Sequence, residues 1–312
     1  MIEKIHRILV VGAGTMGQQI ALQCAMHGYQ VQVYDIVPQM LVTAQHRVEE
    51  YIAELQASSR LSVDEARSTL GRLQYFEHAE DAAQEADLLS ESIVEDPKVK
   101  GEAFARFNRL CPEHTIFTTN TSTLLPSKIA KATGRPAQFA AFHFHNRVWD
   151  SNVVDVMPHP GTDPELVLGL VEFARSIDQI PIVIHHETAS YVFNAMLNGF
   201  LRPALMLAAD GKASVEDIDR AWMGVTKMRL GPFGIIDLIG VDLTYHISTN
   251  MPFYMKMVPS VKRILIFLKQ YVDQGRFGIK SSKGFYNYPN PSFSSPDFLL
   301  GGDFNEEKKL KT

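Results

Sequence analysis

The chain has 312 residues, with 30 Lys and Arg side chains against 35 Asp and Glu, and its formal charge is -5. Hydrophobic residues make up 46% and charged residues 21%, which is typical of globular proteins and excludes collagen-like, coiled-coil and wholly disordered chains. The length suggests about two domains. The slight acidic excess is unlike a dedicated nucleic-acid-binding protein, so we expect no nucleic acid as a partner.

The cysteines and the apolar segments indicate the cellular setting. Cys24 and Cys111 are too few for a disulfide framework, and we interpret both as small core residues. The first apolar run is short and a glycine-rich turn interrupts it, unlike a signal peptide. No run reaches the ~18 apolar residues of a membrane span. We therefore expect a cytoplasmic protein with no membrane partner.

Strand-like and helix-like segments alternate along the first part of the chain. The apolar run at residues 8–11 is typical of a strand that is buried on both faces, and residues 16–28 predict a helix that stops at Gly28. Further strands are predicted at residues 31–35, 73–76, 87–93, 115–119, 139–144, 153–157 and 181–184, and the longest helices between them at residues 38–57 and 99–110. This alternation predicts an α/β domain with a doubly wound, mostly parallel sheet over residues 1–186.

The strand alternation stops near residue 187. Residues 191–209 predict a long apolar helix, and Ser214 with Asp217 resembles a capping box that begins another helix. Two more helices are predicted, at residues 238–250 and 261–274. These segments predict an all-helical domain over residues 187–288. Residues 289–312 are rich in Pro, Ser, Gly and then charged residues, so we expect an exposed or disordered tail.

A glycine motif lies between the first predicted strand and the first predicted helix. In this context G-x-G-x-x-G indicates a dinucleotide site, because its glycines allow a tight turn, close approach of a pyrophosphate and close helix packing. The residues expected to contact the cofactor here are Gly12, Gly14, Thr15, Met16 and Gly17. Asp35 ends the second predicted strand, where its carboxylate can accept both ribose hydroxyls and repel a 2′-phosphate. We therefore predict a Rossmann-type domain that binds NAD.

Two histidines in one predicted strand are candidates for proton transfer. Strand alternation places His143 and His145 on the same face, and the pattern does not choose between them. Histidine is the usual general base because its ordinary pKa is near neutrality. Asp155 is the one charged residue in an apolar strand and needs a partner if it is buried. The alternative that these three residues bind a metal lacks further visible ligands, so we predict no metal.

Several motifs recur in a fixed order along the chain. They lie at residues 11–17, 91–95 with Lys98 and Lys100, 120–122, 143–146, 191–194, 231–234, 278–280 and 284–286. Over residues 5–288 the chain thereby resembles the 3-hydroxyacyl-CoA dehydrogenase family in its short, 3-hydroxybutyryl-CoA dehydrogenase form. The resemblance implies hydride transfer between NAD and the C3 hydroxyl of a short-chain L-3-hydroxyacyl-CoA. It also implies a helical domain that forms a homodimer, and a substrate cleft between the two domains.

The resemblance also implies roles for single residues. It selects His143 as the general base, and the family's glutamate partner, 12 residues later, is here Asp155, which is one methylene shorter. The substrate-binding positions that it implies are Ser122, which is also expected to act on the reacting oxygen, Asn146 and Asn194. Positions expected near the nicotinamide ribose and the domain junction are Glu95, Lys100 and Asn120.

Two departures from the family pattern concern the substrate. Arg147 stands where the family usually has proline, and Arg60 is the candidate replacement for a lysine that holds CoA phosphates, among Glu49, Glu50 and Glu54. One alternative is therefore a free 3-hydroxy acid, as in carnitine and gulonate dehydrogenases, with its carboxylate on Arg147. An alternative of another class is a protein that binds NAD without turnover.

Overall fold

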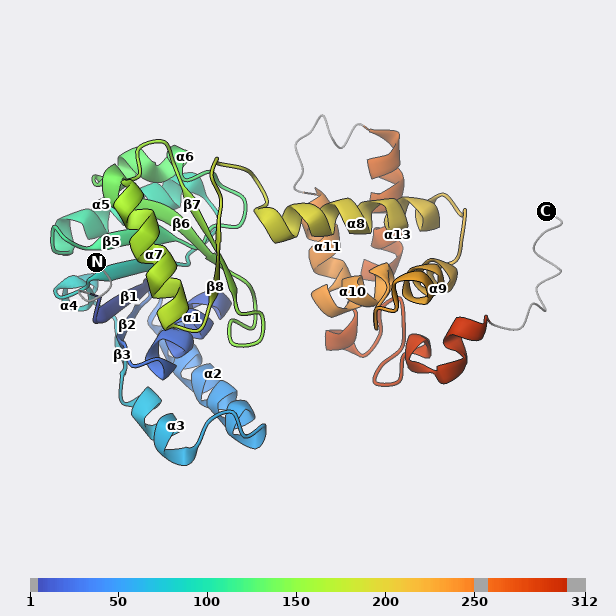
Figure 1. The fold of residues 1–312 in the computed structure, drawn as a ribbon, viewed down its shortest axis with the longest axis horizontal. Helices are drawn as coiled ribbons and strands as arrows, with labels where there is room; N and C mark the ends of the chain where they lie inside the picture. The colour runs from blue at the N-terminus through green and yellow to red at the C-terminus, as the bar shows by residue number, and fades with distance from the viewer. Residues whose placement is uncertain (1–4, 250–257, 302–312) are drawn as a thin grey trace. The chain divides into compact units, whose positions relative to one another are not determined.

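The computed structural model describes residues 5–249 and 258–301. The chain divides into two units, Met1–Phe193 and Asn194–Thr312 (Figure 1). We expected the second domain to begin at residue 187, seven residues earlier in the chain than Asn194, and the domain limits stay a prediction.

The first unit contains an eight-stranded sheet with the order β3-β2-β1-β4-β5-β6-β7-β8. Neighbouring strands are parallel except for β6 and β7, which are antiparallel, so the predicted mostly parallel sheet is confirmed. The strands are β1 (Arg7–Val11), β2 (Gln30–Tyr34), β3 (Leu73–Phe76), β4 (Leu88–Glu91), β5 (Ile116–Thr119), β6 (Phe139–Phe144), β7 (Val153–Pro158) and β8 (Ile180–Val183). The helices are α1 (Thr15–Met26), α2 (Pro38–Ala57), α3 (Val63–Leu70), α4 (Ala79–Ala83), α5 (Pro97–Leu110), α6 (Ser127–Ala130) and α7 (Pro164–Ser176), with short 3-10 turns at Lys131–Thr133 and Pro136–Gln138.

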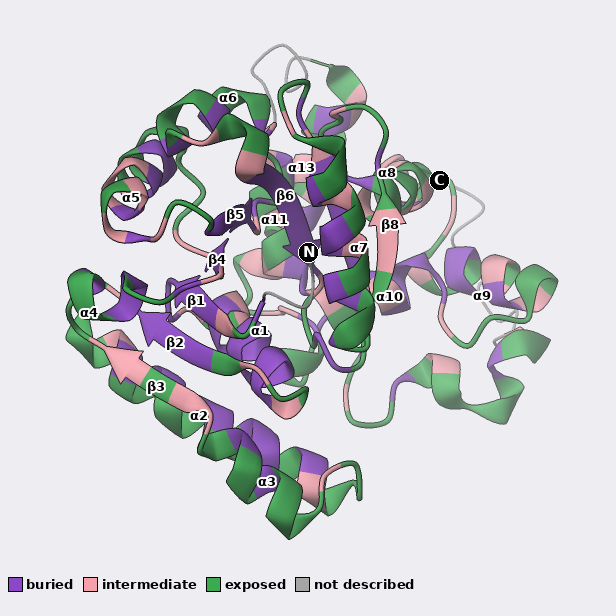
Figure 2. Cartoon of the chain, turned by 60° about the vertical axis from the view of Figure 1, so that its left-hand side comes forward, coloured by how far each residue is buried: buried purple, intermediate pink, exposed green. Residues whose placement is uncertain are grey.

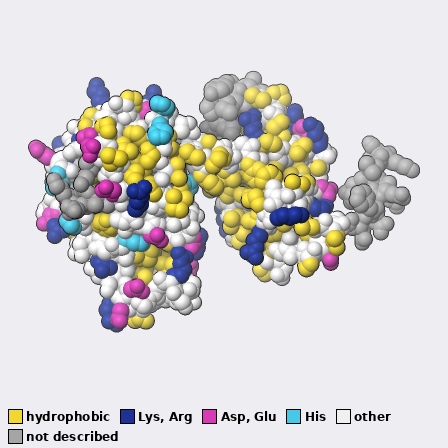
Figure 3. All heavy atoms as spheres, in the orientation of Figure 1, with side chains coloured by type: hydrophobic (Ala, Val, Ile, Leu, Met, Phe, Trp, Pro, Cys, Tyr) yellow, Lys and Arg dark blue, Asp and Glu magenta, His cyan; other side chains and the backbone are white. Residues whose placement is uncertain are grey.

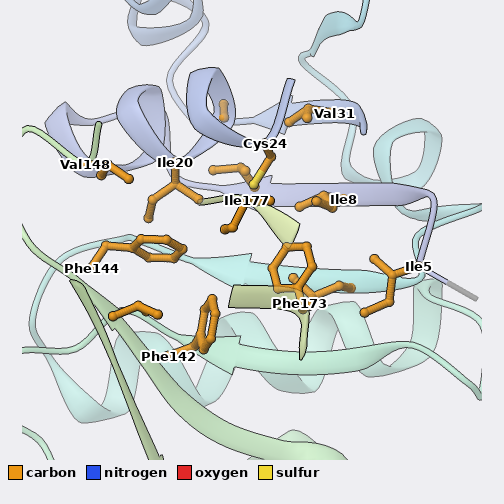
Figure 4. Packing of buried hydrophobic residues seen from close by; sticks show 14 of the residues in the cluster. Ile5, Ile8, Ile20, Cys24, Val31, Phe142, Phe144, Val148, Phe173 and Ile177 are labelled. Atoms are coloured by element: carbon orange, nitrogen blue, oxygen red, sulfur yellow. The ribbon is translucent and has the colours of Figure 1, made fainter. Parts of the chain in front are cut away.

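Helices cover both faces of this sheet, so its central strands are buried throughout (Figure 2). On one face, α1 and α7 contribute Ile20, Cys24 and Phe173 to a cluster with Ile8 and Phe142 of the strands (Figure 4). On the other face, α4 and α5 pack their own apolar residues against the strands. Burial on both faces explains why the strands are continuous apolar runs.

The strand order reverses at β1. The chain passes from β1 to β2 and β3 on one side, and then continues with β4 on the other side of β1. In sheets of this kind ligands bind beyond the carboxyl ends of the strands at the reversal point. This edge of β1 and β4 is therefore where a binding site is expected.

The second unit is helical, as predicted. Its helices are α8 (Val192–Ala209), which begins at the end of the first unit, α9 (Val215–Thr226), α10 (Pro232–Ile239), α11 (Val241–Thr249) and α13 (Pro259–Val272), followed by 3-10 turns at Ile279–Ser281, Ser292–Ser294 and Pro296–Leu300. The helix predicted at residues 238–250 is observed as α11, but its predicted start is too early, because Gly240 has a φ of 112°, outside the helical region, and separates α10 from α11. Residue 250 lies outside the described residues.

Two buried aspartates connect the segments of the second unit. Asp219 of α9 accepts hydrogen bonds from the backbone N–H groups of Phe233 and Gly234, at the start of α10. Asp237 of α10 accepts from the backbone N–H groups of Phe285 and Tyr286. Burial raises the pKa of Asp219 to about 6, against the effect of these donors. Each carboxylate thus satisfies backbone groups that would otherwise be buried without partners.

Residues 289–301 are mostly exposed, as predicted, but they form short 3-10 turns and are not a disordered tail. Phe298 is buried, and the Arg220 side chain of α9 donates a hydrogen bond to its carbonyl oxygen at 2.7 Å. The same guanidinium lies 4.9 Å from the centre of the Phe298 ring. An aromatic side chain that packs on a helix orders this segment in spite of its polar composition. Residues 302–312 lie outside the described residues.

Helix α8 is rich in apolar residues, with Asn194, Asn198 and Arg202 as its polar positions. By length and composition it is the one described helix that could cross a membrane, and 17% of it is buried within the chain. A helix covered by other protein surfaces meets the same criterion, and Pro203 lies in its interior. Figure 3 shows apolar side chains gathered over the part of the second unit where Figure 1 draws α8.

Candidate functional site

The glycine turn after β1 has the geometry of a dinucleotide site. Gly12 has a φ of 106°, and a Cβ at Gly17 would lie 1.8 Å from the carbonyl oxygen of Gly12, so neither position accepts a side chain. A Cβ at Gly14 would meet no atom within 4 Å. Gly14 is also the N-cap of α1, and no side chain caps this helix. The first N–H groups of α1, at Thr15 and Met16, therefore face an open space that suits a phosphate.

Asp35 lies directly after β2 and is held by backbone donors. Its Oδ2 accepts from Ala13 N at 2.8 Å, and its Oδ1 accepts from Val37 N at 2.9 Å. The next two residues, Ile36 and Val37, are apolar yet 79% and 48% exposed. The sequence analysis did not single them out, although two apolar residues after a strand-ending acid were a visible signal. Apolar surface beside a ribose-binding acid suits an adenine ring.

The antiparallel pairing of β6 and β7 places His143 directly opposite Asp155. Nδ1 of His143 lies 3.1 Å from Asp155 Oδ2, and Nε2 lies 3.2 Å from Ser122 Oγ. A carboxylate only accepts hydrogen bonds, so Nδ1 carries the proton and Nε2 carries the lone pair. The structure therefore brings together His143, Asp155 and Ser122 from three separate segments.

The surroundings of this group keep its carboxylate ionised. Burial alone raises the pKa of Asp155, but the hydrogen bonds from His143 and His145 outweigh that effect, and the pKa is lowered. Tyr191 stacks on His143 with ring centres 4.3 Å apart and planes inclined by 4°. Its hydroxyl donates to Thr121 O at 2.7 Å. Sequence reasoning had placed Tyr191 in a family motif without giving it a role in this site.

Tyr191 also has a strained backbone. Its φ is 48°, and the preceding Ser190 has a φ of 74°. Residues with side chains rarely adopt the left-handed region, and such strain persists where the surrounding structure holds it in place. The stacked ring and the hydroxyl contact of Tyr191 supply that restraint next to His143.

Glu95 holds the loop that carries Ser122. Its Oε1 accepts from the backbone N–H groups of Ser122 and Thr123, each at 3.0 Å. Its Oε2 lies 3.3 Å from the ammonium group of Lys100, which also donates to Glu91 at 2.6 Å. The Lys100 and Glu91 side chains are each 1% exposed. These contacts favour positioning roles for Glu95 and Lys100, and their predicted contact with the cofactor stays a prediction.

The three predicted asparagines lie in different settings. Asn120 accepts from Phe144 N at 2.8 Å and holds the end of β6. Asn146 accepts at 2.8 Å from Gln19 of α1, a residue that sequence reasoning missed because no motif contains it. Gln19 also accepts from Arg147 N at 2.6 Å, so the loop after β6 is tied to the helix of the glycine turn. Asn194 begins the second unit, and its role in substrate binding stays a prediction.

Both predicted substrate arginines are already paired. Arg147 donates through Nε to Asp150 Oδ2 at 2.6 Å, and its Nη1 lies 3.7 Å from Glu54. Arg60 pairs with Asp150 as well and donates to the Trp149 carbonyl oxygen at 2.7 Å. A ligand carboxylate or phosphate would therefore compete with acidic side chains for both guanidinium groups.

The atoms that the metal alternative requires do lie together. One ligand-type atom each from His143, His145 and Asp155 lies within 4.8 Å of the others. These atoms also form hydrogen bonds to one another. The absence of a metal stays a prediction.

Two family descriptions match nearly the whole chain. Residues 7–188 match the "3-hydroxyacyl-CoA dehydrogenase, NAD binding domain", and residues 191–288 match the "3-hydroxyacyl-CoA dehydrogenase, C-terminal domain". Among curated proteins, the chain is 31% identical to the human mitochondrial hydroxyacyl-coenzyme A dehydrogenase, over 91% of each chain. It is 30% identical to a probable 3-hydroxybutyryl-CoA dehydrogenase of Bacillus subtilis (strain 168), over 91% of this chain and 98% of that protein. A solved diketoreductase structure is 37% identical, with a TM-score of 0.86 over 91% of this chain and 99% of that one.

Proposed function

The chain belongs to the NAD-dependent 3-hydroxyacyl-CoA dehydrogenase family, and on this premise we propose that it oxidises short-chain L-3-hydroxyacyl-CoA with His143 as general base. The observation that carries the proposal is that the two ring nitrogens of His143 have different partners. Nδ1 faces Asp155, while Nε2 faces the exposed hydroxyl of Ser122. A neutral imidazole held in this tautomer presents its lone pair on the side where a substrate hydroxyl can bind.

The chemistry of the step assigns a role to each residue. The C3 hydroxyl gives its proton to Nε2 of His143 as the carbonyl forms, and Asp155 stabilises the resulting imidazolium. NAD, when bound, accepts the hydride from C3. Ser122 donates a hydrogen bond to the reacting oxygen, and Asn194 and Asn146 are proposed to orient the substrate. In the reverse direction His143 returns the proton as a general acid.

The residues at the glycine turn fit the cofactor that the family uses. The open space at Gly14 and the uncapped start of α1 suit the pyrophosphate. Asp35 suits the adenosine ribose, and the exposed side chains of Ile36 and Val37 suit the adenine.

The pairing of Arg147 disfavours a free acid as substrate. A free carboxylate on Arg147 would have to displace Asp150 and Glu54 from its guanidinium group. The second candidate, a substrate without CoA, is favoured by a different observation. Glu49, Glu50 and Glu54 are exposed on α2 and would repel the CoA phosphates, and the similar diketoreductase acts on dicarbonyl compounds.

A substrate panel followed by NADH absorbance tests the proposal. The panel contains acetoacetyl-CoA, acetoacetate and a 1,3-dicarbonyl ester at equal concentrations. We expect acetoacetyl-CoA to give the highest kcat/KM, by about tenfold or more, because the thioester engages more of the protein surface. Faster turnover of acetoacetate would favour the free-acid alternative. Faster turnover of the ester would favour the second candidate, and no turnover of any compound would favour a binding protein.

A further inference from the structure

Asp155 has a second histidine partner. Oδ2 of Asp155 lies 3.1 Å from His143 Nδ1 and 3.2 Å from His145 Nε2, so one carboxylate oxygen receives both contacts. The other oxygen, Oδ1, is buried and has no partner among the described residues. The rings of His143 and His145 meet edge to face, with centres 5.1 Å apart. His145 lies two residues after His143, directly beyond the end of β6, and its ring reaches the same carboxylate oxygen.

We propose that His145 is a positioning residue that weakens the stabilisation of the His143 imidazolium by Asp155, because it takes a share of the carboxylate charge. The inference rests on the proposed function, in which His143 is the base. Among the described residues, His143 and His145 are the side chains that contact the carboxylate, and the resemblance to the family assigned no role to His145.

The physical argument concerns one charge shared between two donors. A carboxylate that accepts a single hydrogen bond stabilises the imidazolium form of that donor fully. A second N–H on the same oxygen satisfies part of the negative charge and leaves less of it for His143. Since Oδ1 has no partner, removal of the His145 donor would concentrate the charge on the His143 contact. His143 would then hold a proton at higher pH and be a poorer base at neutral pH.

A substitution of His145 leaves the other ionisable side chains near His143 and Asp155 in place. Tyr191 stacks on His143, and burial raises its pKa, so it stays neutral. From the β4–α5 segment, Glu95 reaches the Ser122 backbone, and Lys100 lies between Glu95 and Glu91. A shift in the pH profile would therefore report the His145 contact.

The substitution can be made with little change in shape. His145 packs edge-on against the Phe193 ring at 5.4 Å, a contact that phenylalanine can keep. His145→Phe removes the donor, and His145→Gln supplies an amide N–H in place of Nε2–H. His114→Phe is the matched control, because His114 also pairs with an aspartate, Asp87, but at the opposite edge of the sheet.

The test is the pH dependence of kcat/KM for oxidation, measured for the wild type and these three variants. We expect the acid limb of the kcat/KM profile to lie about half a pH unit higher in His145→Phe than in the wild type. The value of kcat/KM on the alkaline plateau should stay within about threefold of the wild type. His145→Gln and His114→Phe should keep the wild-type limb. If the alkaline plateau of kcat/KM falls in His145→Phe while the acid limb stays at its wild-type pH, His145 is merely structural and the inference is overturned. A pH profile of His145→Phe that matches the wild type would overturn it as well.

Nitrogen-15 spectra of the histidine rings test the inference without activity. In the wild type at pH 8 we expect His143 to carry its proton on Nδ1, and in His145→Phe we expect its titration midpoint to rise by about half a pH unit. An unchanged midpoint would overturn the inference. If the wild type turns over no compound of the panel, the proposed function fails while these spectra still decide the role of His145.

Discussion

Each ring nitrogen of His143 has a partner of its own, and this division fixes what the side chain can do. Asp155 holds the protonated nitrogen, and the other nitrogen points to Ser122. Tyr191 lies flat against the ring and prevents it from tilting away. A base that is oriented before the substrate binds needs little reorganisation during the reaction.

At the same scale, Asp35 is predicted to select NAD over NADP. Asp35→Ser should raise the kcat/KM for NADP relative to NAD by about tenfold or more, because the charge that opposes the 2′-phosphate is gone. The measurement is initial rate against cofactor concentration for both cofactors. Asp87→Ser is the control, since Asp87 also accepts backbone N–H groups but lies at the other edge of the sheet. Equal use of the two cofactors by the wild type would contradict the prediction.

Single residues show how far sequence reasoning reaches. Strand alternation predicted correctly that His143 and His145 share a face. It could not supply the register that puts Asp155 opposite one of them, because register depends on how two strands pair. Gln19 was beyond prediction for a related reason, since its contact with Asn146 joins residues 127 positions apart.

At the scale of the elements, experiments on the turn between β1 and α1 can distinguish the roles of two glycines, Gly14 and Gly17. Gly14→Ala should fold with wild-type stability and bind NAD at least about tenfold more weakly, because its methyl enters open space that suits the pyrophosphate. Gly17→Ala should instead lower the melting temperature, since its Cβ would lie 1.8 Å from the Gly12 carbonyl oxygen. Thermal unfolding and NAD titration of both variants make the comparison. Unchanged NAD affinity in Gly14→Ala would contradict the assignment of the turn.

The loop that follows β5 depends on Glu95. Burial opposes the ionisation of Glu95, but hydrogen bonds from Thr121 and the charge of Lys100 outweigh it, and its pKa is lowered. Glu95→Gln should cost about 1 kcal/mol of stability and lower kcat/KM about tenfold through misplacement of Ser122.

The pH dependence of that cost has a definite sign. Because the folded protein lowers the pKa of Glu95, the advantage of the wild type is complete above about pH 4.3 and disappears as the pH falls through the lowered value. Unfolding by denaturant at pH 7 and at pH 3.5 measures the stability difference between the wild type and Glu95→Gln. The control is Glu102→Gln, on the exposed face of α5. A stability difference that grows in acid would show that Glu95 does not act through its charge.

Element types were predictable where the pattern was long and regular. The strands around the glycine turn and the long helices α2 and α8 follow directly from their hydrophobic periodicity. Two differences from the prediction have local causes. Gly240, with a positive φ, delays the start of α11, and one aromatic residue, Phe298, ordered part of a segment whose composition suggested an exposed or disordered tail.

For the whole molecule, we propose a homodimer. In the single chain, α8 exposes Met196 at 63% and Leu207 at 41%, and an apolar face of this kind is expected to be covered. We expect the wild type to have twice the chain mass of 35.0 kDa by light scattering, and Met196→Glu with Leu207→Glu to have the mass of one chain. Val63→Glu, at an exposed apolar position of α3, is the control. A wild type with the mass of one chain would contradict the proposal.

The account of the whole enzyme depends on proton transfer to His143, and one comparison tests this most directly. The kcat of the wild type and of His143→Gln is measured with acetoacetyl-CoA and NADH, beside the cofactor affinity of each protein. We predict that His143→Gln loses roughly two orders of magnitude or more in kcat, while its cofactor affinity stays within about twofold. A variant that keeps more than about a tenth of the wild-type kcat would contradict the assignment of His143 as the base.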